Sequence, residues 1–405
     1  MSTQIGSTQI GVGVSHHRNP VLAGKEAVEQ ALNQADIQQP DFVMLFSTVG
    51  YRQAPLLKSV RAATHHAPLI GCSGAGILAQ GVTDESNFAV VVLAIQSDEM
   101  QFSQGMSVGL KADSGKVGEA VGKGLTQANI PAAEAKTLFL FLDGITPNFD
   151  EFMAGLRSQT QLEENIPAIG GFAGDNVAYK ETFQYYNDEL ITDGAVWAVL
   201  SGTVEVDSVS SHGCVPMGMQ HTVTKSDRNI VYEVDNQPVL DVLGSYLTKS
   251  EIADWGVAAV NMGWGFDTLQ QQQVNSDSDE KIIRCMIAKN EETQSVQMFS
   301  DVPEGSRFWI TRRDHEQIYS KAEAMSDSLL KKLDGRTPKL IFHVECDGRG
   351  KLIFRENERK TLLSNLQTKI GPAVPWVGLY AFAEIGPIGQ QNCLQNFAGI
   401  LTAFH

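Results

Sequence analysis

Three segments of the chain repeat one order of apolar and polar positions. Each begins with a short apolar run typical of a buried strand, at Phe42–Phe46, Thr137–Leu142 and Leu340–Val344. Glycine-containing turn residues and a stretch of helical character follow. Next comes a Pro-x-Ile/Val-Gly sequence, at Pro68–Gly71, Pro167–Gly170 and Pro375–Gly378. Another apolar strand closes each segment, at Phe88–Ile95, Gly194–Leu200 and Phe397–Phe404. The irregular spacing argues against a solenoid and favours a β-α-β-β unit used about three times.

Helical periodicity separates these strands. Apolar residues recur every three or four positions in Leu56–Thr64 and in Ile318–Leu333, which predicts amphipathic helices. Strands that alternate with helices indicate an α/β fold with mixed sheets and helices packed on their faces. Between Val204 and Phe299 the pattern becomes mainly alternating, with strands expected at Ile230–Val234, Lys281–Ile287 and Ser295–Phe299. We therefore expect two domains, at residues 1–203 and 204–405.

Composition limits the classes of partner. The 405 residues include 31 Lys and Arg against 47 Asp and Glu, a net charge of −16. Such an acidic chain without a basic run is a poor binder of nucleic acid or anionic membranes. The longest apolar stretch, Phe88–Ile95, is far shorter than the roughly 20 residues of a membrane span, and the N-terminus lacks the pattern of a secretory signal. Five widely spaced cysteines favour reduced thiols in a cytoplasmic protein.

The common enzymatic motifs are absent. Gly118–Gly124 is one residue short of a phosphate loop and lacks the Ser or Thr after its lysine. Gly71–Gly76 misses the spacing of a nucleophile elbow by one residue, and no zinc-binding Cys or His pair occurs. These absences favour a binding protein over an enzyme.

Glycine-rich turns after strands are the remaining candidate chemistry. They lie at Gly71–Gly76, Gly170–Asp175, Cys346–Gly350 and Glu384–Gly389. Glycine turns at strand ends let the backbone approach a small molecule, although any single one can be a simple tight turn. Because three of them occupy similar positions in the repeat, we predict a shared ligand cleft. The candidate ligand-binding residues are Cys72, Ser73, Gly74, Gly174, Asp175, Cys346, Arg349, Glu384 and Gly386.

The segment Cys346–Gly350 holds the most concentrated chemistry. Arg349 in a glycine turn could grip a carboxylate in bidentate fashion, which would suit an acidic ligand. The alternative is an ion pair with an acidic neighbour such as Glu384. A Cys346 nucleophile would need a base, and His343 faces the opposite side of the strand.

A second cluster is Ser211–Gly218, where His212 stands between turn-forming residues. An imidazole in this setting could be an axial ligand of haem iron, and the alternative is an ordinary hydrogen-bonded histidine.

A series of motifs along nearly the whole chain carries a family resemblance: Ile70–Gly76, Ile169–Asp175, Gly213–Gly218, Val223–Thr224, Val234–Asp235, Arg312–Asp314, Cys346–Gly350 and Ala383–Pro387. In these motifs and in their order the chain resembles the FIST proteins, in which an N-terminal and a C-terminal FIST domain form a small-molecule sensory module in bacterial signalling. The resemblance implies a FIST N-like ligand-binding domain at 1–203 and a FIST C-like domain at 204–405.

The resemblance also implies a non-catalytic cytoplasmic sensor that passes its signal to a sensor histidine kinase or a cyclic-dinucleotide enzyme. A two-domain chain without an output domain is similar to the branch that senses nitric oxide through haem b, with His212 as the implied axial ligand. Two alternatives stay open: a metal-free sensor of amino acids that uses Arg349, and an enzyme with Cys346 or Cys72 as its nucleophile. The oligomeric state is also open, a homo-oligomer included.

Overall fold

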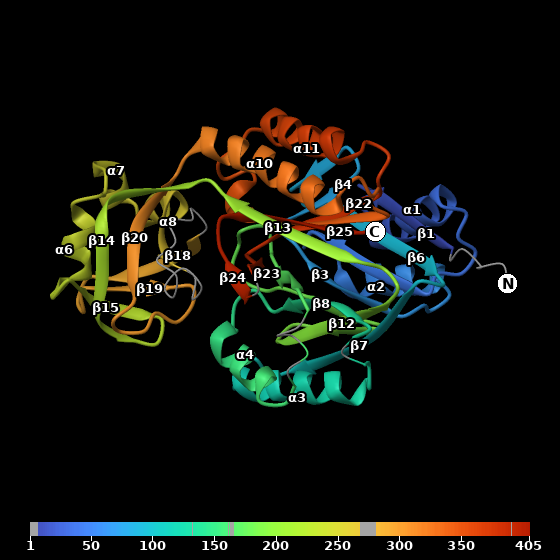
Figure 1. Cartoon of the computed structure of the whole chain (residues 1–405), viewed down its shortest axis with the longest axis horizontal. Helices are drawn as coiled ribbons and strands as arrows, with labels where there is room; N and C mark the ends of the chain where they lie inside the picture. Colours follow the sequence, from blue (N-terminus) through green and yellow to red (C-terminus); the bar gives the residue numbers. More distant parts are fainter. Residues whose placement is uncertain (1–6, 132, 161, 163–165, 268–280, 390) are drawn as a thin grey trace.

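The computed structural model describes residues 7–131, 133–160, 162, 166–267, 281–389 and 391–405. Within these residues the chain consists of three repeated units and one segment inserted into the third (Figure 1). Each unit has the order strand, helix, strand, helix, strand, hairpin and closing strand. The predicted β-α-β-β unit matches the second strand, second helix, third strand and closing strand of each unit. It omits the strand and helix that precede them and the hairpin before the closing strand.

The bounds of the elements follow the repeat. Unit 1 contains β1 (Thr8–Ser15), α1 (Pro20–Gln34), β2 (Phe42–Ser47), α2 (Gln53–Ala63), β3 (Leu69–Ser73), β4 (Gly76–Ala79), β5 (Val82–Asp84) and β6 (Val90–Ser97). Unit 2 contains β7 (Met100–Val108), α3 (Ser114–Gln127), β8 (Ala135–Leu142), α4 (Phe149–Arg157), β9 (Ala168–Phe172), β10 (Gln184–Tyr186), β11 (Glu189–Ile191) and β12 (Gly194–Gly202). Unit 3 contains β13 (Val206–His212), α10 (His315–Leu333), β21 (Leu340–Cys346), the short 3-10 turn η1 (Asp347–Arg349), α11 (Glu356–Ile370), β22 (Trp376–Ala381), β23 (Ala383–Ile388), β24 (Gln391–Gln395) and β25 (Ala398–Phe404).

The inserted segment, Cys214–Arg313, lies between β13 and α10. It contains β14 (Cys214–Asp227), β15 (Ile230–Val234), β16 (Gln237–Pro238), α6 (Val239–Gly244), α7 (Lys249–Ala253), α8 (Trp255–Asn261), β17 (Met262–Asp267), β18 (Lys281–Asn290), β19 (Ser295–Met298) and β20 (Arg307–Arg313). Its strands form one sheet in the order β14-β20-β17-β18-β19-β15-β16, and a further pairing of β14 with β15 closes it. In Figure 1 this segment forms the left-hand lobe of the molecule.

Each of the three units contributes its hairpin to the sheet of another unit. The sheets have the orders β1-β6-β2-β3-β10-β11, β7-β12-β8-β9-β23-β24 and β13-β25-β21-β22-β4-β5. In each sheet one parallel pair, such as β2 with β3, lies among antiparallel neighbours. The last two strands come from another unit each time, so the hairpin of unit 1 extends the sheet of unit 3. Strands from before and after residue 203 thus share sheets, and the division at 203/204 stays a prediction.

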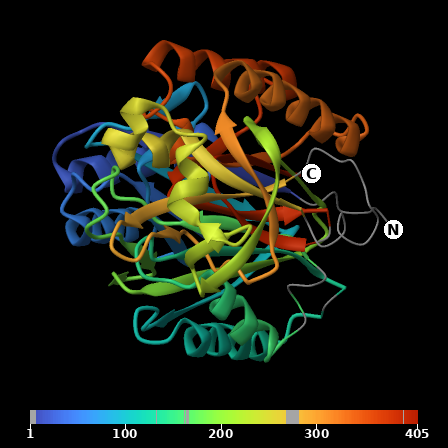
Figure 2. The same cartoon turned by 90° about the vertical axis from the view of Figure 1, so that its left-hand side faces the viewer.

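The helices cover the outside of the three sheets and the core fills the space between them. The pairs α1 and α2, α3 and α4, and α10 and α11 occupy separate outer faces (Figures 1 and 2). Between the sheets, aromatic residues from different units pack together, with ring centroids 5.3 Å apart for Phe46 and Phe141 and 5.8 Å apart for Phe46 and Phe342. The expected α/β fold with mixed sheets is confirmed. In the described part of the chain, no helix is long and apolar enough to cross a membrane.

The repeated glycine of the Pro-x-Ile/Val-Gly sequence has a packing role. A Cβ atom at Gly71 would overlap the backbone oxygen of Leu45 on the neighbouring parallel strand. The same holds for Gly170 against Leu140 and for Gly378 against His343. The Pro-x-Ile/Val-Gly sequence recurs because its glycine allows the same close approach of two parallel strands in each unit.

Candidate ligand-binding site

The strand ends that carry the predicted glycine turns meet at the centre of the three units. The amide of Ala75 donates to the carbonyl of Tyr380 (2.9 Å), and the amide of Gly174 donates to that of Ser73 (2.9 Å). The ring closes where the amide of Phe382 donates to the carbonyl of Phe172 (3.0 Å). The turns after β3 and β9 therefore lie side by side, and a ligand cleft shared by all the glycine turns stays a prediction. The segment that begins at Glu384 is strand β23 rather than a turn, because it pairs with both β9 and β24.

A cavity of about 850 Å³ lies beside this centre, between the repeated units and the inserted segment. We call it the central cavity. Residues after β8, β9 and β21 line one side, and residues of the inserted segment line the other. A pocket of this size, enclosed by two parts of a fold, is typical of a small-molecule site.

Aromatic side chains form much of the wall of the central cavity. The rings of Tyr179 and Phe382 are stacked, with centroids 4.5 Å apart. Phe172 and Phe299 also line it, at a centroid distance of 5.7 Å, and Phe397 adds a third ring surface. These faces offer broad apolar contact to a flat ligand.

Three buried polar atoms in the residues that line the cavity have no hydrogen-bond partner among the described residues. They are Oδ2 of Asp347, Nδ2 of Asn396 and Oγ of Ser300. Buried polar groups are normally paired, and an unpaired one costs about 1–3 kcal/mol. Three such atoms in residues that line one cavity favour a site that is completed by a ligand or by ordered water.

Burial also changes the titration of Asp347. Removal from water raises the pKa of its carboxyl to about 7, against a hydrogen bond from the backbone of Gly348 that lowers it. Perturbed carboxyls cluster at functional sites, and this one lies in the largely apolar central cavity.

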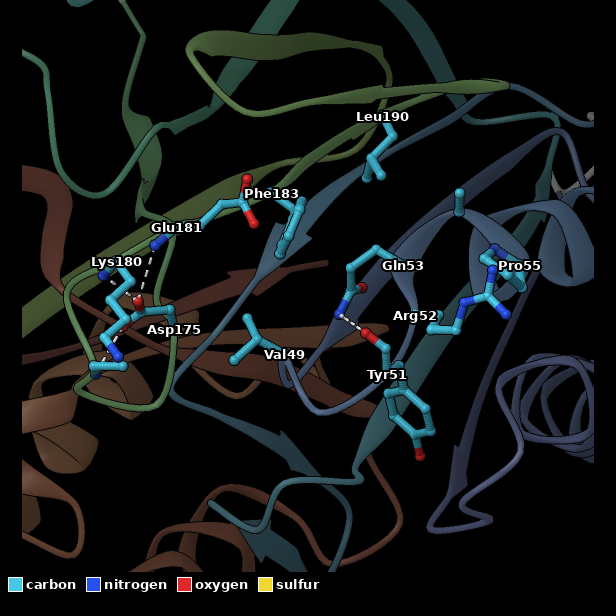
Figure 3. Close-up of a pocket in the computed structure, with 12 residues that line it drawn as sticks. Val49, Tyr51, Arg52, Gln53, Pro55, Asp175, Lys180, Glu181, Phe183 and Leu190 are labelled. Atoms are coloured by element: carbon cyan, nitrogen blue, oxygen red, sulfur yellow. Dashed lines mark hydrogen bonds between the residues drawn. The ribbon is translucent and has the colours of Figure 1, made fainter.

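The loop that carries Tyr179 is held by a single carboxylate. Asp175 accepts hydrogen bonds from the backbone amides of Ala178 (2.9 Å), Tyr179 (2.8 Å), Lys180 (2.5 Å) and Glu181 (3.1 Å). Figure 3 shows this carboxylate beneath the backbone of Lys180 and Glu181. Asp175 is thus a positioning residue for one wall of the central cavity, not a member of that wall.

Backbone strain in the same loop supports a functional role. Val177 has φ 70° and Tyr179 has φ 52°, and both residues line the central cavity. The left-handed region is a genuine outlier for a β-branched residue, and such strain costs about 1–3 kcal/mol per residue. Strained residues of this kind concentrate at ligand clamps and active sites.

Of the predicted ligand-binding residues, the structure brings Cys346 to the central cavity. Its thiol accepts a hydrogen bond from the amide of Phe397 (3.2 Å) and donates to Oδ1 of Asp347 (3.7 Å). Burial raises the pKa of Cys346 well above its usual value, and the nearby carboxyls of Glu384 and Asp347 raise it further. A protonated buried thiol is a poor nucleophile.

Most of the other predicted residues have structural contacts. Cys72 is fully buried in the core, where burial raises its thiol pKa. The hydroxyl of Ser73 donates to the carbonyl of Gly174 (2.7 Å) and accepts from the amide of Phe183 (3.0 Å). A Cβ atom at Gly74, Gly174 or Gly386 would crowd a neighbouring chain segment. These residues serve the packing of the fold.

Arg349 and Glu384 form separate buried contacts. Nε of Arg349 pairs with Oε1 of Glu345 (2.5 Å), and its Nη1 donates to the carbonyl of Ser211 (2.7 Å). The predicted alternative, an ion pair, therefore describes Arg349, but its partner is Glu345. Glu384 accepts from the amide of Ala398 (3.0 Å), and burial raises its pKa.

Sequence reasoning missed Asp347, Asn396 and Tyr179 as cavity residues. Asp347 belongs to the turn that was singled out, but the interpretation rested on its arginine. Nothing in the sequence around Asn396 or Tyr179 predicts that these two residues, which belong to different units, line the same cavity.

A second cavity, of about 1270 Å³, lies against β13, α10 and the hairpin β23–β24. We call it the lysine-lined cavity, after Lys281, Lys321, Lys331 and Lys332. His212 is among its lining residues, and its Nδ1 accepts a hydrogen bond from the amide of Cys214 (3.1 Å). A neutral ring that accepts at Nδ1 carries its proton on Nε2, the nitrogen that would have to bind iron.

A histidine that binds a metal normally donates its other ring N–H instead. Binding of haem iron at Nε2 would require His212 to change this tautomer, and haem binding stays a prediction. Among the described residues, no group of three or more His, Cys, Asp and Glu side chains is arranged to hold a metal ion.

A third, smaller cavity of about 560 Å³ lies on the other side of the Asp175 loop (Figure 3). Val49, Gln53 and Phe183 are among its lining residues, and Gln53 Nε2 donates to the carbonyl of Tyr51 (3.1 Å). Asp175 and Gln53 are both occupied by these local bonds, whereas the buried hydroxyl of Tyr51, which also lines this cavity, has no hydrogen-bond partner among the described residues.

Comparison with known families gives two matches along the chain. The FIST N domain matches residues 41–237, and the FIST C domain matches residues 240–387. The chain belongs to the FIST family. The expected family membership is thus confirmed, and the two matched regions meet within the inserted segment. FIST domains suggest a role in sensing small molecules, and neither match addresses haem or nitric oxide.

Similar proteins extend along the whole chain. An uncharacterized protein of Mycobacterium bovis is 23% identical over 403 residues, covering 98% of each chain. An uncharacterized protein of Mycobacterium tuberculosis is 25% identical over 408 residues, covering 98% of this chain and 99% of the relative. Among solved structures, a cyanuric acid hydrolase from A. caulinodans is 8% identical with a TM-score of 0.37, covering 98% of this chain and 99% of that one. At that level of likeness, nothing of the hydrolase's activity carries over to this FIST protein.

Proposed function

We propose that this FIST protein is a non-catalytic sensor whose small-molecule ligand binds in the central cavity. The observation that carries the proposal is the set of three unpartnered polar atoms, on Asp347, Asn396 and Ser300, in the residues that line one aromatic-walled cavity. The family membership supports a sensory role. A ligand that fills the cavity contacts both the repeated units and the inserted segment, so its binding stabilises their arrangement.

Transmission of the signal is the second part of the proposal. Polar bonds join the inserted segment to unit 2 beside the cavity: Asn148 Nδ2 donates to both carboxylate oxygens of Asp301 (3.2 Å each), and the amide of Asp301 donates to Asp150 (3.2 Å). A ligand that changes this contact would change the surface offered to a partner. In a bacterial cytoplasm, a sensor histidine kinase or a cyclic-dinucleotide enzyme is the partner that we propose.

Ligand binding is tested by a thermal-shift screen of small molecules with a pair of matched variants. Ile287→Trp places a large side chain at the central cavity, where Ile287 is 47% exposed, so the protein core is not disturbed. Ile252→Trp makes the same change at a residue of the inserted segment that is 53% exposed and does not line the cavity. We expect ligands that stabilise the wild type and Ile252→Trp but not Ile287→Trp. Equal stabilisation of both variants would place the site elsewhere.

Two observations support the absence of catalysis in this proposal. The thiol pKa values of Cys72 and Cys346 are raised by burial, so neither is prepared as a nucleophile. The Cys346 thiol contacts a carboxylate and a backbone amide, and no histidine, among the described residues. Turnover of any cavity ligand by the wild type, lost in Cys346→Ala, would contradict the proposal.

Sensing through haem would require a rearrangement at His212. Its ring would have to release the amide of Cys214 and take the other tautomer before Nε2 could bind iron. An absorption spectrum of the protein with added haem b, with and without nitric oxide, tests this form beside His212→Ala. A Soret band that depends on His212 and responds to nitric oxide would establish it.

A further inference from the structure

The unpartnered atoms of the central cavity define what a ligand must offer. Oδ1 of Asn396 accepts from the amide of Cys285 (3.1 Å), which fixes the side-chain amide and leaves Nδ2 as the unpartnered donor. A complementary ligand must therefore present an acceptor to Asn396. Oδ2 of Asp347 is an unpartnered oxygen that accepts when the carboxyl is ionised, so the same ligand can present a donor there.

Asn396 and Asp347 each lie next to one partner of the same hydrogen bond. The amide of Phe397, which follows Asn396, donates to the thiol of Cys346, which precedes Asp347 (3.2 Å). Both residues line the cavity and are nearly fully buried, at 1% exposed for Asn396 and 5% for Asp347. Asn396 and Asp347 therefore lie next to a shared contact on the cavity wall, and we place the required acceptor and donor at one end of the ligand.

Charge disfavours an anionic ligand at this end. Three charged residues line the central cavity: Arg228, Asp301 and Asp347. Arg228 pairs with Glu151 (3.2 Å), and both carboxylate oxygens of Asp301 accept from Asn148. The nearby guanidinium of Arg313 lies over the Phe397 ring at 4.6 Å and donates to the carbonyl of Gly348, a lining residue beside Asp347. Its charge lowers the pKa of Asp347, so this cation already balances that carboxylate. A ligand carboxylate would thus face the ionised Asp347 without a further cation beside it among the described lining residues.

We infer that the central cavity recognises an uncharged, planar amide, such as an aromatic carboxamide, a lactam or a cyclic imide, whose carbonyl accepts from Asn396 and whose N–H donates to Asp347. The inference rests on the proposed function and names its ligand class. The stacked rings of Tyr179 and Phe382 and the faces of Phe172 and Phe397 provide the apolar contact for the flat body. The acidic ligand expected from Arg349 has no counterpart here, because Arg349 is occupied by Glu345.

Isosteric pairs of probes test the inference. Dissociation constants of 2-naphthamide and 2-naphthoate, and of nicotinamide and nicotinate, are measured by ligand-observed NMR at pH 8, where the carboxyl of Asp347 is mainly ionised. We expect each amide to bind at least about tenfold more tightly than its acid, because the acid leaves a buried acceptor unpaired and repelled. Asn396→Leu should weaken the amides by about tenfold.

Two further variants separate local pairing from overall charge. Asp347→Asn removes the carboxylate and should bring the acid to within about threefold of the amide. Asp301→Asn makes the same change in charge on the same cavity, at a carboxylate already paired with Asn148, and should keep the preference for amides. An acid that binds the wild type as tightly as its amide, or a preference that Asp347→Asn leaves unchanged, would overturn the inference.

The same experiment distinguishes this inference from the proposed function. Anionic or cationic probes that bind the wild type but not Ile287→Trp would retain the cavity as the site and overturn its preference for amides. If no molecule of any charge binds in a way that Ile287→Trp abolishes, the proposed function itself is wrong.

Discussion

Replacement of Asp347 by asparagine should stabilise the protein, and more so as the pH rises. The folded protein holds this carboxyl with a pKa of about 7 because burial disfavours its ionised form. In the unfolded chain an aspartate has a pKa of about 3.9. Between these two values the folded state binds more protons than the unfolded state, so the wild type loses stability as the pH rises. The total loss above pH 7 is about 4 kcal/mol, at 1.36 kcal/mol per pKa unit.

Asparagine keeps the shape of the side chain but cannot ionise, so the loss is absent in the variant. Relative to the wild type, Asp347→Asn should gain about 3 kcal/mol of unfolding free energy between pH 5 and pH 8. Urea denaturation followed by tryptophan fluorescence at these two pH values measures the gain. Asp241→Asn, at an exposed position of α6, serves as the control with the same chemical change. A difference that stays constant from pH 5 to pH 8, or one that reverses sign, would refute the reasoning.

Three further substitutions or reactions test other parts of the structure. Gly71→Ala should leave little folded protein by size-exclusion chromatography, because the added Cβ overlaps the backbone oxygen of Leu45. The control Gly81→Ala should remain folded, because the Cβ at that position (φ 69°) meets open space. Arg349→Met should cost about 3–5 kcal/mol in urea denaturation, because it leaves Glu345 buried without its cation, and Glu345→Gln in addition should recover part of that loss. Iodoacetamide at pH 8 should label Cys346 at least about a hundredfold faster in urea than in the folded protein, because the thiol is buried and its pKa raised; equal rates would contradict this environment.

Much of the core could be predicted from the sequence because its physical requirements repeat. The close approach of parallel strands demands glycine at positions 71, 170 and 378, and the preceding prolines mark where these strands begin. The helices expected at Leu56–Thr64 and Ile318–Leu333 begin and end within three residues of the bounds of α2 and α10. Each of these signals depends on neighbours along the chain.

The exchange of hairpins could not be predicted in this way. Strand β4 consists of the four residues Gly76–Ala79, and nothing in them states that they extend the sheet of unit 3, some 300 residues later in the chain. The role of Arg349 was missed for a different reason, because its partner is local. A glycine turn indicates that the backbone bends, but not that a 3-10 turn at Asp347–Arg349 brings the guanidinium back to Glu345, four residues earlier.

The central cavity lies where the three units depart from their common pattern. The pairing of Leu45, Leu140 and His343 with the three repeated glycines makes Val49, Gly144 and Asp347 equivalent positions, each four residues further along. Only unit 3 places an ionisable side chain at this position, and unit 3 also carries the inserted segment that closes the cavity. The loop after β9 adds strained residues that have no counterpart in the corresponding segment after β3, where β4 begins at Gly76. A symmetric core packs equivalent residues from all three units. A single ligand instead contacts one set of groups, and these groups differ from the residues at the equivalent positions of the other units. Positions where one unit carries a polar residue and the other two do not are therefore the best sequence signal for the site.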